Sequence, residues 1–176
     1  IVVALLSFFA LLIAFVWWEL RASNPMLELR LFQRRTFAFG VSGALFMFLG
    51  NSAVLFLMPF YLQGVLGFNA RSAGLIVVPG AFCMALMGPI SGSLSDRYGW
   101  RWFTVGGLAS SATGLFLLSR LTENSSLALV MPALILTSAG LGSFYSPNAS
   151  SVLSAVELEK YGIVSALLNL VRNGAN

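Results

Sequence analysis

The sequence predicts an all-α protein: a polytopic bundle of transmembrane helices, with about five complete spans and the start of a sixth. Two observations lead to this fold class. The 176 residues are 58% hydrophobic and only 9% charged, with a mean hydropathy of +0.88, whereas a soluble domain carries about 25% charged residues. The apolar residues also fall into separate long runs, and a bilayer core requires about 20 residues of helix. The expected surroundings are therefore a lipid bilayer.

The apolar runs set the expected helices in chain order. They cover residues 1–18, 37–62, 72–94, 102–118 and 127–150, and a sixth helix begins near Tyr161 or Gly162. The alternative is a β-barrel, which requires segments of about ten residues that alternate between polar and apolar side chains. Runs such as LLSFFALLIAFVWW and SAVLFLMPFYL show no such alternation, so we expect helices.

Residues near the ends of these runs support the boundaries. The pair Trp17–Trp18 ends the first run, and Trp100 and Trp102 flank the fourth, as in an aromatic belt at a membrane surface. Residues 26–35 (MLELRLFQRR) mix apolar and basic side chains, which predicts a segment lying at the cytoplasmic interface. Asn124–Ser126 supplies N-cap candidates for the fifth run.

The basic residues predict the orientation, because Lys and Arg favour the cytoplasmic side of short membrane loops. Counted over alternate loops, seven fall on one side, two on the other, and one lies in the sixth helix, which accounts for all ten. The seven are Arg21, Arg30, Arg34, Arg35, Arg97, Arg101 and Lys160. The two are Arg71 and Arg120, and the one inside a helix is Arg172. The first side is therefore the expected cytoplasmic side.

Small residues recur four positions apart along the expected helices, a spacing that lets membrane helices approach closely. The pairs are Gly40 and Ala44, Gly88 and Gly92, Gly107 and Ser111, Ser110 and Gly114, and Gly142 and Ser146. We expect these positions to be packing faces.

The composition also argues against several classes of function. The chain has no histidine and one cysteine, Cys83, so the usual zinc and haem ligand sets are missing and no metal or cofactor is expected. The basic residues are spread between apolar runs, which does not indicate a nucleic-acid partner. All six acids fall in expected loops or at helix ends: Glu19, Glu28, Asp96, Glu123, Glu157 and Glu159. A membrane enzyme would need such groups clustered at depth, so we expect no enzymatic activity.

The stretch SGSLSDRYGWRW (91–102) is expected to contain a linker of about six residues between two helices. Asp96 would stand at the C-terminal end of a helix, where the dipole already disfavours an acid, so it requires a partner. From the residues alone, an ordinary hydrated cytoplasmic loop and a loop with a specific function explain these charges equally well.

The spacing Gly92-x-x-x-Asp96-Arg97-x-Gly99-x-Arg101 resembles the loop motif of the major facilitator superfamily. In that family the motif joins the second and third helices of each six-helix half. Trp100 stands where the family usually has a basic residue, a departure that is common in the copy carried by the C-terminal half.

Two further segments resemble the fourteen-helix drug:proton antiporter (multidrug efflux) branch of this family. ELRASNPMLELRLFQRRTF is similar to the segment that follows the extra central helix pair. GLGSFYSPNASSVLSAV and YGIVSALLNLVRNGAN are similar to the fourth and fifth helices of the C-terminal half. The resemblance implies a central linker helix at 1–18, a cytoplasmic loop at 19–36 and a partial C-terminal half at 37–176. We therefore expect a fragment that is cut at both ends.

The resemblance implies a transporter that works by alternating access in a bacterial plasma membrane. A conformational gate on the cytoplasmic face would consist of Gly92, Asp96, Arg97, Gly99 and Arg101. Candidate substrate-cavity residues are Phe48, Asn51, Ser52, Tyr145, Asn148 and Arg172. Aromatic rings in an apolar cavity would suit amphipathic drugs and attract organic cations. Ordinary packing or lipid contact remains an alternative for each of these residues.

Proton coupling normally uses an acid within the membrane. None of the six acids is expected there, so the coupling site would lie in an N-terminal part that this chain does not include. Metabolite uptake by a member of the same family, and a channel or non-transporting membrane module, remain the alternative functions.

Overall fold

The computed structural model describes residues 10, 14, 17, 18, 21 and 29–174, so most of the helix expected at 1–18 lies outside the described residues. The described part contains helices and no strand, which confirms the all-α fold class. A 3-10 helix, η1 (Leu29–Gln33), leads into α2 (Arg35–Phe60), which continues through the π-helical η2 (Tyr61–Val65). The remaining elements are α3 (Ala70–Tyr98), α4 (Trp100–Leu118), α5 (Leu127–Leu153), η3 (Leu158–Lys160) and α6 (Tyr161–Gly174).

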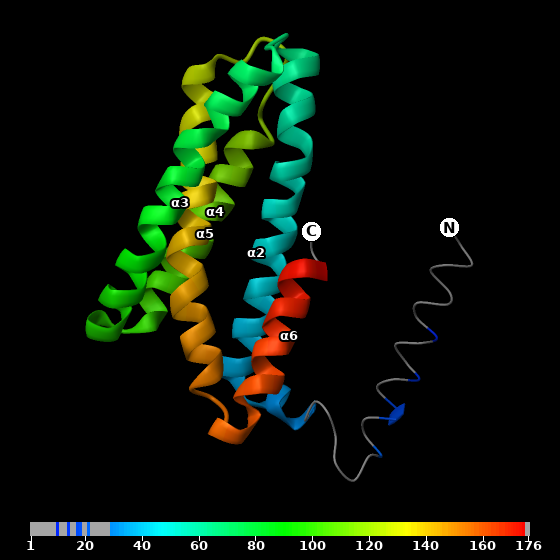
Figure 1. Ribbon diagram of the computed structural model, residues 1–176, viewed down its shortest axis with the longest axis vertical. Helices are drawn as coiled ribbons and strands as arrows, with labels where there is room; N and C mark the ends of the chain where they lie inside the picture. The colour runs from blue at the N-terminus through cyan, green and yellow to red at the C-terminus, as the bar shows by residue number, and fades with distance from the viewer. Residues whose placement is uncertain (1–9, 11–13, 15–16, 19–20, 22–28, 175–176) are drawn as a thin grey trace.

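Successive helices run up and down, so their ends form two layers (Figure 1). One layer holds the start of α2, the α3–α4 junction and the α5–α6 connection. Arg34, Arg97 and Arg101 belong to this layer, whereas Arg71 and Arg120 belong to the other. The alternation of helices thus keeps the basic residues on the two sides predicted from the sequence. We name the first layer the cytoplasmic end, after the orientation that the basic residues predict.

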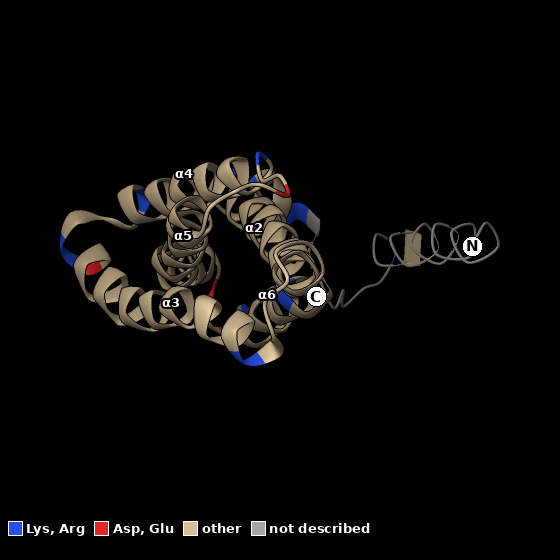
Figure 2. Ribbon diagram, turned by 90° about the horizontal axis from the view of Figure 1, so that it is seen from above, with Lys and Arg blue, Asp and Glu red and all other residues tan. Residues whose placement is uncertain are grey.

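Helix α5 packs between α3 and α4, and α2 and α6 lie together beside this three-helix unit (Figure 2). The helices α2 with η2, α3 and α5 are long and apolar enough to cross a membrane. Helix α4 has 19 residues, or about 28 Å of helix, close to the thickness of a bilayer core. Its middle, GGLASSATG, is rich in small residues, and this composition suits close packing against α5.

The predicted linker within residues 91–102 is wrong. Helix α3 continues to Tyr98 and α4 begins at Trp100, so Gly99 alone joins the two helices. Gly99 has φ +88°, a conformation that residues with a Cβ rarely adopt. Asp96 and Arg97 are exposed on the last turn of α3, where water can solvate their charges while the backbone remains helical. Helix α3 therefore ends at Gly99, and the charged residues Asp96 and Arg97 do not interrupt it.

The other helix starts are close to those expected. Helix α3 begins two residues earlier than predicted, because the side chain of Asn69 accepts a hydrogen bond of 2.8 Å from the Ser72 amide and caps it. Ser126 occupies the N-cap position of α5 with extended backbone, but its hydroxyl makes no capping hydrogen bond. Helix α6 begins at Tyr161, one of the two starts predicted.

Glycines allow α5 to approach both of its main neighbours closely. A Cβ on Gly107 would stand 2.7 Å from the Gly140 carbonyl oxygen, and a Cβ on Gly142 would stand 2.7 Å from the Met84 carbonyl oxygen. Such separations confirm the predicted packing role of these small residues. Gly88 is different, because a Cβ there would meet nothing within 4 Å among the described residues.

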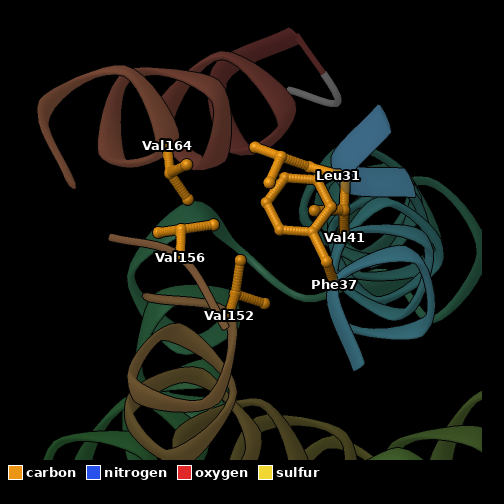
Figure 3. Packing of buried hydrophobic residues seen from close by; sticks show 6 residues of the cluster. All are labelled: Leu31, Phe37, Val41, Val152, Val156 and Val164. Atoms are coloured by element: carbon orange, nitrogen blue, oxygen red, sulfur yellow. The ribbon is translucent and has the colours of Figure 1, made fainter. Parts of the chain in front are cut away.

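A buried apolar cluster holds the cytoplasmic ends of α2, α5 and α6 together (Figure 3). Its members are Leu31, Phe37, Val41, Val152, Val156 and Val164. Beside it, the Arg34 guanidinium donates a hydrogen bond to the carbonyl oxygen of Ala155, just beyond the end of α5. A cation near the carbonyl end of a helix also complements the helix dipole. These contacts fix α6 against the α2–α5 pair.

Candidate functional site

Four of the five predicted gate residues lie at the turn between α3 and α4, and Gly92 lies two helical turns earlier on α3. Asp96, Arg97 and Arg101 are exposed, and the Arg101 guanidinium lies 5.4 Å from the centroid of the Trp100 ring. Among the described residues, no ion pair joins Asp96 to an arginine. Gly92 faces α5, where an added Cβ would stand 3.0 Å from the Ser146 hydroxyl oxygen. The turn therefore presents both signs of charge to its surroundings and is anchored through a close helix contact.

Three of the predicted cavity residues meet across α2, α5 and α6. Phe48 is buried and packs edge-on against the ring of Tyr145, with 6.1 Å between ring centroids. The Arg172 guanidinium donates a hydrogen bond of 3.3 Å to the Tyr145 hydroxyl and lies 5.9 Å from the centroid of its ring. Tyr145 and Arg172 remain exposed. The sequence predicted these positions separately, and the fold makes them one cluster.

Asn51 lines a cavity of about 210 Å³ between α2, α3 and α5. Its walls are otherwise almost wholly apolar, apart from the hydroxyl of Ser138. The lining residues are Asn51, Val54, Leu55, Met58, Pro59, Val77, Ala81, Met84, Leu134 and Ser138. Ser138 was not predicted, although it stands seven residues before Tyr145 and therefore on the same face of α5. This seven-residue spacing is the sequence pattern from which Ser138 could have been predicted as a cavity residue.

Asn148 lies within the packing of α2 against α5. The residue is 3% exposed, and its side-chain amide nitrogen donates a hydrogen bond of 3.1 Å to the Gly40 carbonyl oxygen. The Asn148 side-chain oxygen is buried without a hydrogen-bond partner in the described part of the chain. Ser52 is half-buried on α2 and does not line the Asn51 cavity. A role in substrate binding remains a prediction for both residues.

A second hollow, of about 340 Å³, lies between α2 and α4 nearer their outer ends. Tyr61 is part of its lining, and the Tyr61 hydroxyl donates a hydrogen bond of 2.8 Å to the Thr122 carbonyl oxygen. None of the predicted site residues lines this hollow. The smaller cavity, which holds Asn51 and lies on the same α2–α5 seam as Phe48 and Tyr145, is therefore the better candidate for a substrate site.

The described residues contain no group of three or more His, Cys, Asp or Glu side chains that could hold a metal ion. Cys83 is half-buried in α3. The described acids stand on the last turn of α3 or in the connections that follow α4 and α5: Asp96, Glu123, Glu157 and Glu159. Glu157 forms an ion pair of 3.6 Å with Lys160 in the α5–α6 connection.

Comparison with known proteins gives one family and several relatives. The family model described as Major Facilitator Superfamily matches residues 1–176. The chain is similar to the riboflavin transporter RibZ of Clostridioides difficile, with 32% identity over 88% of this chain and 34% of the relative. It is also similar to the multidrug resistance protein Stp of Mycobacterium tuberculosis, with 32% identity over 90% of this chain and 29% of the relative.

A third relative is the lincomycin resistance protein LmrB of Listeria monocytogenes, with 28% identity over 90% of this chain and 34% of the relative. The chain thus spans about a third of the length of the relatives that it matches. No solved structure gives a significant match.

Proposed function

The chain belongs to the Major Facilitator Superfamily, and from this premise we propose that the whole protein exports amphipathic small molecules by alternating access, driven by protons. The chain is part of a multi-pass integral membrane protein of the bacterial plasma membrane. The family is one of transporters rather than enzymes. This chain supplies five described α-helices of the whole protein, α2 to α6.

The observation that carries the proposal is the position of the Asn51 cavity along its helices. Asn51, Ala81 and Ser138 each lie within about three residues of the middle of their helices, which corresponds to the middle of a bilayer. A mostly apolar cavity with a few polar groups at this depth is typical of a transporter binding site. The names of two relatives, which refer to drug resistance, support export of such compounds.

We assign the α3–α4 turn to the conformational gate of this transporter. Asp96 and Arg97 project from the last turn of α3, and Gly99 alone joins this helix to α4. Exposed charges of opposite sign can form ion pairs with another part of the protein in one conformation and release them in the other. Arg101 and the close contact at Gly92 would hold the turn in position against α5.

We place the proton-coupling acid outside this chain. The acids that the structure describes stand at helix ends and in connections, and Glu19 and Glu28 precede the described range 29–174. A group that carries protons across the membrane has to lie within a span or along a water-filled path. The remaining two thirds of the protein would supply that group.

A second candidate function is the transport of a vitamin-like metabolite. It is favoured by the similarity to a relative named as a riboflavin transporter. The Asn51 cavity is compatible with this function, because an aromatic heterocycle also requires apolar walls and a few hydrogen-bonding groups. The two candidates share the alternating-access mechanism and differ in substrate.

Transport by inside-out vesicles that contain the full-length protein tests the proposal. We expect fluorescent amphipathic compounds to accumulate in the vesicles when a proton gradient is imposed, and not in vesicles from cells without the gene. Riboflavin belongs in the same panel, and its selective movement would favour the second candidate. If a proton gradient drives no compound into the vesicles, proton-driven export is wrong.

Asp96→Asn tests the gate in the same vesicles. We expect the maximal transport rate to fall about fivefold, which corresponds to the loss of about 1 kcal/mol from a charged contact. The half-saturating substrate concentration should change little, because Asp96 is remote from the cavity. Glu123→Gln is the control, since Glu123 is an exposed acid at the opposite end of the bundle. Equal rates for Asp96→Asn and the unmodified protein would exclude the gate assignment.

A further inference from the structure

We infer that the Asn51 cavity binds an uncharged ring of the substrate whose edge carries both a hydrogen-bond donor and an acceptor. Lactams, ureides and other cyclic amides have such an edge. Asn51 and Ser138 are then the residues that select the substrate. This inference deepens the proposed function and rests on it, since the cavity is taken to be the substrate site.

The two polar side chains of the cavity form no hydrogen bond within the part of the chain that the structure describes. The hydroxyl of the neighbouring Thr137 donates a hydrogen bond of 2.8 Å to the Ala133 carbonyl oxygen of its own helix, as hydroxyls within helices commonly do. The Ser138 hydroxyl makes no such bond. Because Asn51 and Ser138 are half-buried and line the cavity, their polar groups face space that a ligand can fill.

Gly80 on α3 leaves room for the Ser138 side chain. A Cβ on Gly80 would stand 2.8 Å from the Ser138 hydroxyl oxygen and 3.4 Å from the Leu134 carbonyl oxygen. The hydroxyl therefore lies where α3 and α5 meet, whereas Asn51 belongs to α2. Two polar contacts from different helices define how a planar ligand lies between them.

The chemistry of the two side chains indicates the kind of ligand edge that they bind. The amide group of Asn51 offers an acceptor oxygen and a donor nitrogen side by side, so it can pair with another amide through two hydrogen bonds. The Ser138 hydroxyl adds one donor and can also accept. A site that is built to form hydrogen bonds discriminates strongly against an analogue that lacks the matching groups.

The walls of the cavity favour an uncharged ligand. None of the described residues that line it is charged or aromatic. The sequence led us to expect aromatic rings that attract organic cations, but the rings of Phe48 and Tyr145 pack against each other outside this lining. Moving a charge into apolar surroundings without a counter-charge costs far more than moving an amide that is hydrogen-bonded.

The size of the cavity limits how much of the substrate it holds. Its volume of about 210 Å³ is below the range of about 300–1,000 Å³ that is typical of pockets for drug-sized ligands. The cavity therefore suits one ring system of a larger compound. Met58 and Met84 are part of the wall, and flexible methionine side chains can adapt to rings of different outline.

Binding measurements on the full-length protein in lipid nanodiscs test the inference with matched bicyclic probes. The probes are 2-quinolone, N-methyl-2-quinolone, the cationic N-methylquinolinium and the anionic quinoline-2-carboxylate. Titration calorimetry, with empty nanodiscs as the baseline, gives their dissociation constants. We expect 2-quinolone to bind about fivefold more tightly than N-methyl-2-quinolone, which lacks the donor. Both charged probes should bind more weakly than either quinolone.

Two variants assign this preference to the side chains. Asn51→Leu retains the size of the side chain without its polar groups, and it should reduce the preference for 2-quinolone to less than about twofold. Ser138→Ala should weaken the binding of 2-quinolone by about two- to threefold. Thr113→Val is the control, because it removes an exposed hydroxyl of α4 that bonds the Ala109 carbonyl oxygen, and it should leave every constant unchanged.

Several results would overturn the inference. They are equal binding of the two quinolones by the unmodified protein, tighter binding of a charged probe, no measurable binding of 2-quinolone, or an unchanged preference in Asn51→Leu. A partner for Asn51 elsewhere in the full-length protein would give the first of these results. If Asn51→Leu does not fold, Asn51→Ala decides, and an unchanged preference refutes the site. An unchanged 2-quinolone constant in Ser138→Ala removes Ser138 from it.

Transport of the same probes distinguishes this inference from the proposed function. Selective binding of 2-quinolone without gradient-driven movement of any probe would retain the site and remove the export function. Gradient-driven movement of a charged probe alone would retain export and remove the site for an uncharged ring.

Discussion

The Asn148 side chain shows how one buried amide can determine a helix crossing. It spans the contact between α5 and α2, and its amide nitrogen reaches the carbonyl oxygen of Gly40. A Cβ added to Gly40 would overlap the Val152 Cγ2 methyl group and would stand 3.3 Å from the Asn148 side-chain oxygen. Gly40 therefore lets α2 lie close to Val152 and Asn148 on α5, and the Asn148 hydrogen bond joins the two helices at this point.

Asn148→Ala should lower the stability of the full-length protein. The substitution removes the hydrogen bond and leaves the Gly40 carbonyl oxygen without that donor, a loss of about 1–3 kcal/mol. Thermal unfolding of the detergent-solubilised protein measures the effect as a lower midpoint temperature. Asn51→Ala is the matched control on the facing helix, because Asn51 is half-buried at a cavity. An equal loss of stability in Asn51→Ala would contradict this assignment of roles.

Sequence reasoning identified several site residues individually but could not pair them. Phe48 and Tyr145 were predicted because each is an aromatic residue at helical spacing with polar neighbours. The contact between them, and the hydrogen bond from Arg172, depend on the relative rotation of three helices, which a single sequence does not encode in any local pattern. Ser138 was missed for a related reason, since a lone serine within an apolar helix resembles a packing residue.

At the scale of elements, close glycine contacts hold α5 against α4. A Cβ on Gly107 would meet two backbone atoms, the Gly140 carbonyl oxygen at 2.7 Å and the Phe144 amide nitrogen at 2.9 Å. Backbone atoms cannot move aside as a flexible side chain can, so the two helices would have to separate. The adjacent Gly106 faces away from this contact, and an added Cβ there meets nothing within 4 Å in the described part of the bundle.

Gly107→Ala should therefore destabilise the protein by about 1–3 kcal/mol, the range observed for overpacking. Gly106→Ala should have no adverse effect, because alanine favours a helix over glycine by about 1 kcal/mol. Thermal unfolding of the two variants, which carry the same substitution one residue apart, gives the comparison directly. Similar midpoints for the pair would show that the α4–α5 contact does not depend on Gly107.

The helices themselves were largely predictable from the sequence. Hydrophobic length placed the start of α5 at Leu127, because a membrane span is specified by its apolar run. The end of α3 was not predictable in this way. Its last turn carries the charged residues Asp96 and Arg97. The apolar run therefore ends before the helix, which continues as far as Gly99.

At the scale of the whole molecule, the described helices expose apolar surface that a bilayer and other helices must cover. Large side chains such as Phe39, Phe46, Phe56 and Phe82 are each more than 60% exposed on α2 and α3. Contiguous apolar surfaces of this kind mark contact with lipid or protein. Alternating access requires a second helical body against which this one can move, and the relatives are about three times as long as this chain.

The 176-residue chain alone should therefore not transport. Reconstituted in lipid vesicles, it should show a helical circular dichroism spectrum and yet move no fluorescent compound when a proton gradient is applied. The reason is that rocking between two halves and an acid at depth are both required for coupling, and the described helices carry their acids at the ends. The full-length protein in the same vesicles is the control.

Gradient-driven movement of dye by the 176-residue chain would place the coupling site within it. The search for a proton carrier would then turn to Asp96 on the last turn of α3 and to Glu157 and Glu159 in the α5–α6 connection.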